Sequence, residues 1–163
     1  MSERVEAGPA IRTAVAADLP ALQRVYREAS LSNAGDAPVL LARPEFLVFA
    51  GDGIAAGRTL VALDGPPDEG RIVGFATVAT GDDGGLELED LFVDPERRRR
   101  GIARHLVRAV AGAARADGHR RLWVTGNPHA LAFYLAAGFV QIEGQVSTEL
   151  GSGLRMSLDL SRA

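Results

Sequence analysis

Residues 86–106 have the sequence LELEDLFVDPERRRRGIARHL. Apolar residues nearly alternate up to Val93, which predicts a half-buried strand that stops at Pro95, because proline cannot donate a hydrogen bond to a neighbouring strand. From Ile102 onward apolar residues recur at helical spacing, and four arginines and Gly101 lie just before this helix. The free N–H groups and positive dipole end of a helix start favour an anion, and a glycine lets a ligand approach the backbone. The stretch therefore predicts a phosphate-binding loop.

Composition narrows the class of protein. The length suits one domain, so we expect residues 1–163 to form a single domain with a sizeable core. A net charge of -3 argues against a general nucleic-acid binder or a membrane-surface protein. The sequence has no apolar run long enough for a transmembrane helix or a signal peptide, so we expect a cytoplasmic protein. With neither cysteine nor lysine, the chain cannot form disulfides, thiolate metal sites, a Schiff base or a Walker-type phosphate loop.

The rest of the chain alternates between strand and helix patterns. Strands are predicted at 11–15, 59–63, 71–80, 86–93, 121–125, 139–142 and 154–160, and helices at 18–29, 39–49, 101–117 and 127–138, with Asp18 as a helix cap. Turn residues at 64–67 and 81–85 join three of the strands into an antiparallel meander. The order β-α-α-β-β-β-α-β-α-β-β predicts an α+β fold, with a mixed, largely antiparallel central sheet and helices on both of its faces.

Two motifs occur in order on these elements. Residues 98–103, RRRGIA, follow the strand that ends near Pro95, and Asn127 is followed seven residues later by Tyr134 and then by Gly138-Phe139. The chain thereby resembles the GNAT-type N-acetyltransferases, whose pyrophosphate motif is Arg/Gln-x-x-Gly-x-Gly/Ala and whose second motif combines an Asn, a Tyr and a Gly-Phe pair.

The resemblance, which is specific over residues 86–139, implies a site for acetyl-CoA between the strands at 88–93 and 121–125. The residues that it implies for the cofactor are Leu91, Phe92 and Val93 on the first strand, Arg98, Arg99, Arg100, Gly101, Ile102, Ala103 and Arg104 at the helix start, and Asn127 and Tyr134 beyond the second strand. The loop amides would hold the pyrophosphate, the strand would align the pantetheine arm and the acetyl carbonyl, and the asparagine would touch the pantetheine arm. No metal is expected, since the three histidines lack metal-ligand spacing.

Acetyl transfer to an amine needs a base for the ammonium proton, donors for the oxyanion and an acid for the departing thiolate. Glu87 and Glu89 are the candidate bases, because in a regular strand both lie on the face opposite Leu86 and Leu88. Both could instead be ordinary solvent-facing carboxylates, with a water relaying the proton. Asp90 interrupts the alternation and is better explained as a bulge or turn residue.

The resemblance assigns the role of thiolate proton donor to Tyr134, although an aromatic residue on an amphipathic helix is often simply part of a core. Asn127 is predicted to cap the helix that it begins, whatever else it contacts. Because the chain has no cysteine, we expect direct attack by the amine in a ternary complex.

The acceptor is expected between residues 26–49 and 146–153, which hold few charges. The acidic side chains of Glu87, Glu89 and Asp90 favour a cationic primary amine of a small metabolite or a peptide. The main alternative is a non-catalytic acyl-CoA-binding sensor or scaffold with the same fold. Nucleic-acid binding through the arginine run is disfavoured, because the run is short and the whole chain is acidic. No membrane partner is expected, and the chain could act as a monomer or a homodimer.

Overall fold

The computed structural model describes residues 8–65, 70–81, 84–97, 100–148 and 151–161. A seven-stranded sheet forms its centre, in the order β1-β2-β3-β4-β5-β7-β6. The strands are β1 (Ala10–Thr13), β2 (Thr59–Asp64), β3 (Arg71–Thr80), β4 (Leu86–Val93), β5 (Arg121–Gly126), β6 (Val140–Thr148) and β7 (Gly151–Asp159). β4 and β5 run parallel, and the other described neighbours run antiparallel. The predicted mixed, largely antiparallel sheet is confirmed.

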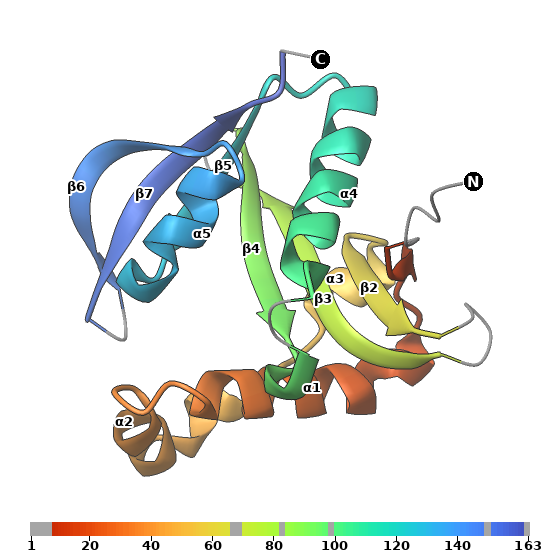
Figure 1. Cartoon of the computed structure of the whole chain (residues 1–163), viewed down its shortest axis with the longest axis vertical. Helices are drawn as coiled ribbons and strands as arrows, with labels where there is room; N and C mark the ends of the chain where they lie inside the picture. The colour runs from red at the N-terminus through yellow and green to blue at the C-terminus, as the bar shows by residue number, and fades with distance from the viewer. Residues whose placement is uncertain (1–7, 66–69, 82–83, 98–99, 149–150, 162–163) are drawn as a thin grey trace, which may run out of the picture.

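Helices lie on both faces of this sheet, as predicted. They are α1 (Leu19–Leu31), α2 (Ala37–Ala42), α3 (Asp52–Ala55), α4 (Ile102–Ala116) and α5 (Leu131–Ala136), with short 3₁₀ turns η1 (Ala16–Asp18), η2 (Pro44–Leu47), η3 (Pro95–Arg97) and η4 (Pro128–Ala130). α4 buries its apolar stripe in one core cluster, and α1 buries its own in a second cluster. Figure 1 shows α1 crossing one end of the sheet and α4 standing beside β3 and β4. Among the described residues, no helix is long and apolar enough to cross a membrane.

Three local expectations need correction. The helix predicted over residues 39–49 is present only in part, because it is divided at Pro44, whose ring disfavours helical geometry in the preceding Arg43 (φ -129°). Asp18 does not cap α1; it accepts a hydrogen bond from Val15 N at 2.8 Å and pairs with Arg12. The third concerns β6, which runs six residues further than the predicted strand at 139–142 because it pairs with β7.

β4 and β5 separate soon after they meet. They pair only at Leu86↔Leu122, Glu87↔Trp123 and Leu88↔Val124, although β4 continues to Val93. Figure 1 shows β4 leaning away from the β5, β6 and β7 strands beyond this point. The edge of β4 that would face β5 is therefore without a strand partner over its second half.

A bulge divides β4 at the same place. Thr77 lies opposite Asp90 and Val78 opposite Leu88, so Glu89 is an extra residue without a partner on β3. In a regular strand Asp90 would point with Leu88 into the core under α4. Because of the extra residue, the alternation reverses, and Leu91 and Val93 point into that core instead. Phe92 points to the opposite face and packs in the cluster under α1. Asp90 thus lies on the α1 face, and the predicted bulge at this position is confirmed.

Candidate active site

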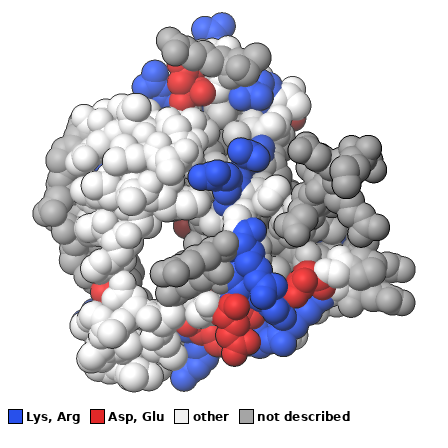
Figure 2. Space-filling view, in the orientation of Figure 1, with Lys and Arg blue, Asp and Glu red and all other residues white. Residues whose placement is uncertain are grey.

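The start of α4 offers uncapped backbone donors. Gly101, its N-cap residue, has φ 74°, a left-handed conformation that side chains rarely adopt, and no side chain of the described residues caps the helix. The first-turn amides of Ile102, Ala103 and Arg104 have no partner within a helix, so they can donate to an anion. Arg100 and Arg104 are exposed beside them, and Figure 2 shows basic side chains on this face of the molecule.

Not all of the arginine run is available to a ligand. Arg97, just before the motif, forms an ion pair with Asp64 of β2 at 3.2 Å. Arg98 and Arg99 lie outside the described residues. Arg100 and Ile102 line a cavity of about 810 Å³ together with residues of β1 and β2.

The turn between β4 and α4 is held by a residue that the sequence did not single out. Asp94 has only 2% of its side chain exposed, accepts a hydrogen bond from Glu96 N at 3.0 Å, and lies 3.3 Å from Arg24 of α1. Its own N–H donates to the carbonyl of Val73 at 2.8 Å. These contacts tie the turn to α1 and β3, so the helix start has a fixed position relative to the end of β4.

A larger cavity, of about 1130 Å³, lies between the loop that joins α1 to α2 and the segment that joins β5 to α5. Figure 2 shows the molecule hollowed between these two regions. Its described lining consists of Tyr26, Ala29, Ser30, Ser32, Asn33, Ala34, Gly35, Asp36, Leu40, Phe92, Thr125, Gly126, Asn127, Pro128, His129, Ala130 and Gly153. Apart from the imidazole of His129, the charged side chain in that lining is Asp36. Phe92 and Asn127, both predicted for the cofactor, face the same space.

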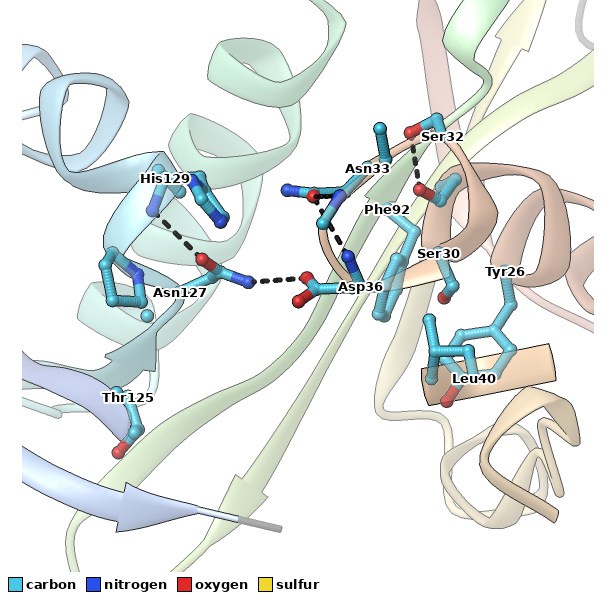
Figure 3. A pocket seen from close by; sticks show the side chains of 17 residues that line it. Tyr26, Ser30, Ser32, Asn33, Asp36, Leu40, Phe92, Thr125, Asn127 and His129 are labelled. Carbon is cyan, nitrogen blue, oxygen red and sulfur yellow. Dashed lines mark hydrogen bonds between the residues drawn. The ribbon is translucent and has the colours of Figure 1, made fainter. Parts of the chain in front are cut away.

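Asn127 connects the two sides of this cavity. Its side-chain oxygen accepts a hydrogen bond from His129 N at 2.9 Å, which confirms the predicted cap of the following turn. Its amide nitrogen donates to the carboxylate of Asp36 at 3.4 Å, and Figure 3 shows the two side chains pointing toward each other. No local sequence pattern predicts this contact, because the residues are 91 positions apart.

Tyr134 lies on α5 with 7% of its surface exposed. Its ring packs edge-on against Phe133 and Phe139, and a Cβ at Gly126 would lie 2.9 Å from it, so a glycine makes room for the ring at the end of β5. Burial raises the pKa of Tyr134 to about 12, which keeps its hydroxyl protonated at neutral pH. Tyr134 is not among the described lining residues of the larger cavity, but its contact residue Gly126 is.

The carboxylates on β4 have different surroundings. Both oxygens of Glu87 accept hydrogen bonds from Arg155 of β7, whose guanidinium also lies 4.9 Å from the centre of the Trp123 ring. Glu89 is 58% exposed and lies 4.0 Å from Arg58. Because Glu89 is the bulged residue, the regular alternation that predicted its direction does not apply.

Asp90, the third carboxylate of this strand, is partly removed from solvent. Burial raises its pKa to about 6, opposed by a hydrogen bond from the Thr77 hydroxyl. Burial also raises the pKa of Tyr26, a residue of α1 that lines the larger cavity, and the charge of Asp90 adds to this shift.

Comparison with known proteins places these features in a family. The model of the acetyltransferase (GNAT) family matches residues 19–139. A mycothiol acetyltransferase of Mycobacterium sp. (strain JLS) is 40% identical over 73 residues, which are 45% of this chain and 23% of that protein. The chain thus spans about a quarter of the length of the curated relative that it matches.

Solved structures show the same fold. The PaiA N-acetyltransferase of Thermoplasma acidophilum, in complex with coenzyme A, superposes with a TM-score of 0.73 at 19% identity, covering 94% of this chain and 99% of that one. A phosphinothricin acetyltransferase of Sinorhizobium meliloti, in complex with acetyl-CoA, gives 0.67 at 22% identity, covering 94% of this chain and 89% of that one.

Proposed function

Because this chain belongs to the acetyltransferase (GNAT) family, we propose that it transfers the acetyl group of acetyl-CoA to a primary amine. One observation carries the proposal: β4 and β5 separate after Leu88 and Val124, beside a helix start that no described side chain caps. The complexes of structural neighbours with coenzyme A and acetyl-CoA support the same cofactor.

The open strand edge and the helix start suit the two chemical parts of this cofactor. Backbone groups of Leu91, Phe92 and Val93 on the edge left by β5 can pair with the amides of a pantetheine arm, as a neighbouring strand would. The amides that follow Gly101 can hold the pyrophosphate, with Arg98 to Arg100 and Arg104 adding positive charge. Asn127 would contact the pantetheine arm from the end of β5.

The reaction that we propose is direct attack of the amine on the thioester. A carboxylate of β4 takes one proton from the ammonium, and the neutral amine then forms a bond to the acetyl carbon. The bonded nitrogen loses a second proton to solvent as the carbon–sulfur bond breaks. Tyr134 gives its proton to the departing sulfur, and its burial suits this role because the hydroxyl stays protonated. The products are an amide and the free thiol of coenzyme A, and the tyrosine recovers its proton from solvent.

The charges around the larger cavity favour an acceptor that carries an ammonium group but no carboxylate next to it. Asp36 contributes a negative charge to the described lining, and no arginine is part of that lining. Residues 143–153 contain no basic residue in their sequence either. In the described lining a substrate carboxylate would therefore find no arginine to pair with, whereas an ammonium group has Asp36.

The proposal is tested by incubating the purified chain with acetyl-CoA and a panel of amines, and by following free thiol and the acetylated product. The panel contains polyamines, amino sugars, aminoacyl amides, amino acids and amine-bearing peptides. We expect thiol release to depend on an amine that lacks an adjacent carboxylate. Tight binding of acetyl-CoA without thiol release across the panel would favour the sensor or scaffold instead, and absence of both would refute the proposed function.

A further inference from the structure

Three carboxylates lie within four consecutive residues of β4, and their surroundings determine which can accept a proton from a substrate. Glu87 is held on both oxygens by Arg155, with one N–O distance of 2.8 Å. To accept a proton, Glu87 would have to give up part of this ion pair. The position of Glu87 beside Trp123, in the part of β4 that still pairs with β5, indicates a structural role.

Glu89 is the extra residue of the bulge. Its side chain is 58% exposed, and Arg58 lies 4.0 Å away.

Asp90 differs from both. The bulge turns Asp90 away from the α4 core and toward α1, onto the same strand face as Phe92, which lines the larger cavity. Tyr26 lies across from this face, with its ring 4.9 Å from that of Phe92, and it lines the cavity as well. Within the described chain no arginine lies within ion-pair distance of Asp90.

The groups that face Asp90 are few. Tyr26 approaches it from α1, the hydroxyl of Thr77 from β3, Arg58 from the start of β2, and Glu89 is its neighbour on β4. Tyr26 donates its own hydroxyl to the carbonyl of Phe46 at 2.5 Å, so that hydroxyl is already engaged. A carboxylate in this setting is desolvated without being neutralised, which makes it a better proton acceptor than a solvated one.

Resting on the proposed function, we propose that Asp90 is the catalytic base of this chain, in place of Glu87 or Glu89. Its carboxylate takes one proton from the substrate ammonium, directly or through one water, and the neutral amine then bonds to the acetyl carbon. The bonded nitrogen is much more acidic than the ammonium was, so its second proton passes to solvent as the carbon–sulfur bond breaks. The resulting carboxylic acid then releases its proton to solvent.

The test compares Asp90→Asn, Glu87→Gln and Glu89→Gln, with the exposed Asp117→Asn as the control for loss of a carboxylate. For the wild type we expect kcat/KM to fall below a pH of about 6, where the base becomes protonated. Asp90→Asn should lower kcat by about 10²- to 10³-fold, abolish that inflection, and leave acetyl-CoA affinity within about twofold of the wild type. Glu87→Gln and Glu89→Gln should keep the inflection.

A second variant covers the case in which Asp90→Asn does not fold. Thr77→Val removes the hydrogen bond that lowers the pKa of Asp90, so the inflection should move to higher pH. An unchanged inflection in this variant, or a wild-type pH profile in Asp90→Asn, would overturn the assignment while the proposed function stands. Failure of the wild type to release thiol with any amine would refute the proposed function and the assignment together.

Discussion

β4 behaves as two different strands on either side of Glu89. From Leu86 to Leu88 it has a partner on each side, and its carboxylate is neutralised by Arg155. Beyond the bulge it pairs with β3 alone, and the carboxylate of Asp90 is desolvated without an ion pair among the described residues. One strand can thus contribute to stability at its paired end and to the reaction at its open end. Substitutions at the paired end should mainly lower stability, and substitutions at the open end should mainly lower turnover.

After that of Asp90, the largest effect is expected across the opening, at Tyr134. Tyr134→Phe removes the proton donor but keeps the ring that packs on Phe133 and Phe139. We expect kcat to fall by about 10²-fold, as for loss of a general acid, while calorimetry gives an acetyl-CoA affinity close to that of the wild type. Equal turnover of the two proteins at saturating acetyl-CoA would remove Tyr134 from the mechanism.

The next effect is expected at the start of α4. Gly101→Ala forces a Cβ into a left-handed conformation, which costs about 1–2 kcal/mol, and it disturbs the amides proposed for the pyrophosphate. We expect acetyl-CoA affinity to fall by about tenfold, since this corresponds to about 1.4 kcal/mol of binding free energy.

Gly112→Ala is the matched control in the same helix. Gly112 is exposed, and a Cβ there meets no described atom within 4 Å. This substitution should stabilise the protein by about 0.5–1 kcal/mol through helix propensity and leave binding unchanged. If both glycine variants bind acetyl-CoA like the wild type, the helix start does not hold the cofactor.

A smaller effect is expected at the paired end of β4. A double-mutant cycle of Glu87→Gln and Arg155→Gln should give a coupling free energy of about 1 kcal/mol in chemical unfolding, because the pair is bidentate but partly solvated. Turnover of Glu87→Gln should fall far less than that of Asp90→Asn. The reverse ranking, with turnover lost at Glu87, would break the distinction between the two ends of β4.

The smallest effect is expected at the rim of the larger cavity. Asp36→Asn keeps the shape of the side chain that meets Asn127 but removes its charge. Because the contact is exposed and long, we expect less than about 0.5 kcal/mol of lost stability. The KM for a cationic amine should rise by about threefold, while that for acetyl-CoA stays unchanged. An unchanged amine KM would place the acceptor away from Asp36.

Much of the fold followed from local patterns. The strand ending near Pro95, the helix after Gly101 and the cap at Asn127 each depend on a few neighbouring residues, whose backbone preferences fix the element. The split of the predicted helix at 39–49 was also local, since Pro44 restricts the residue before it.

The remaining features depend on pairing across the sheet. Arg155 is 68 positions from Glu87, and the two meet only because β7 lies beside β5. The face of the sheet on which Asp90 lies depends on the position of the bulge in the pairing of β4 with β3. The spacing of residues within β4 does not determine that position. The sequence therefore limits the candidate bases to the carboxylates of β4, and the proposal of Asp90 over Glu87 and Glu89 required the structure.

The central claim is that the open end of β4 and the start of α4 hold coenzyme A together. Amide-resolved NMR titration with coenzyme A tests it most directly, because it reports on each backbone N–H. We expect the largest changes in amide chemical shift at residues 91–93 and 101–104, with smaller changes near Asn127. Changes confined to the smaller cavity, at residues such as Leu63 and Gly65, or no changes at all, would contradict it.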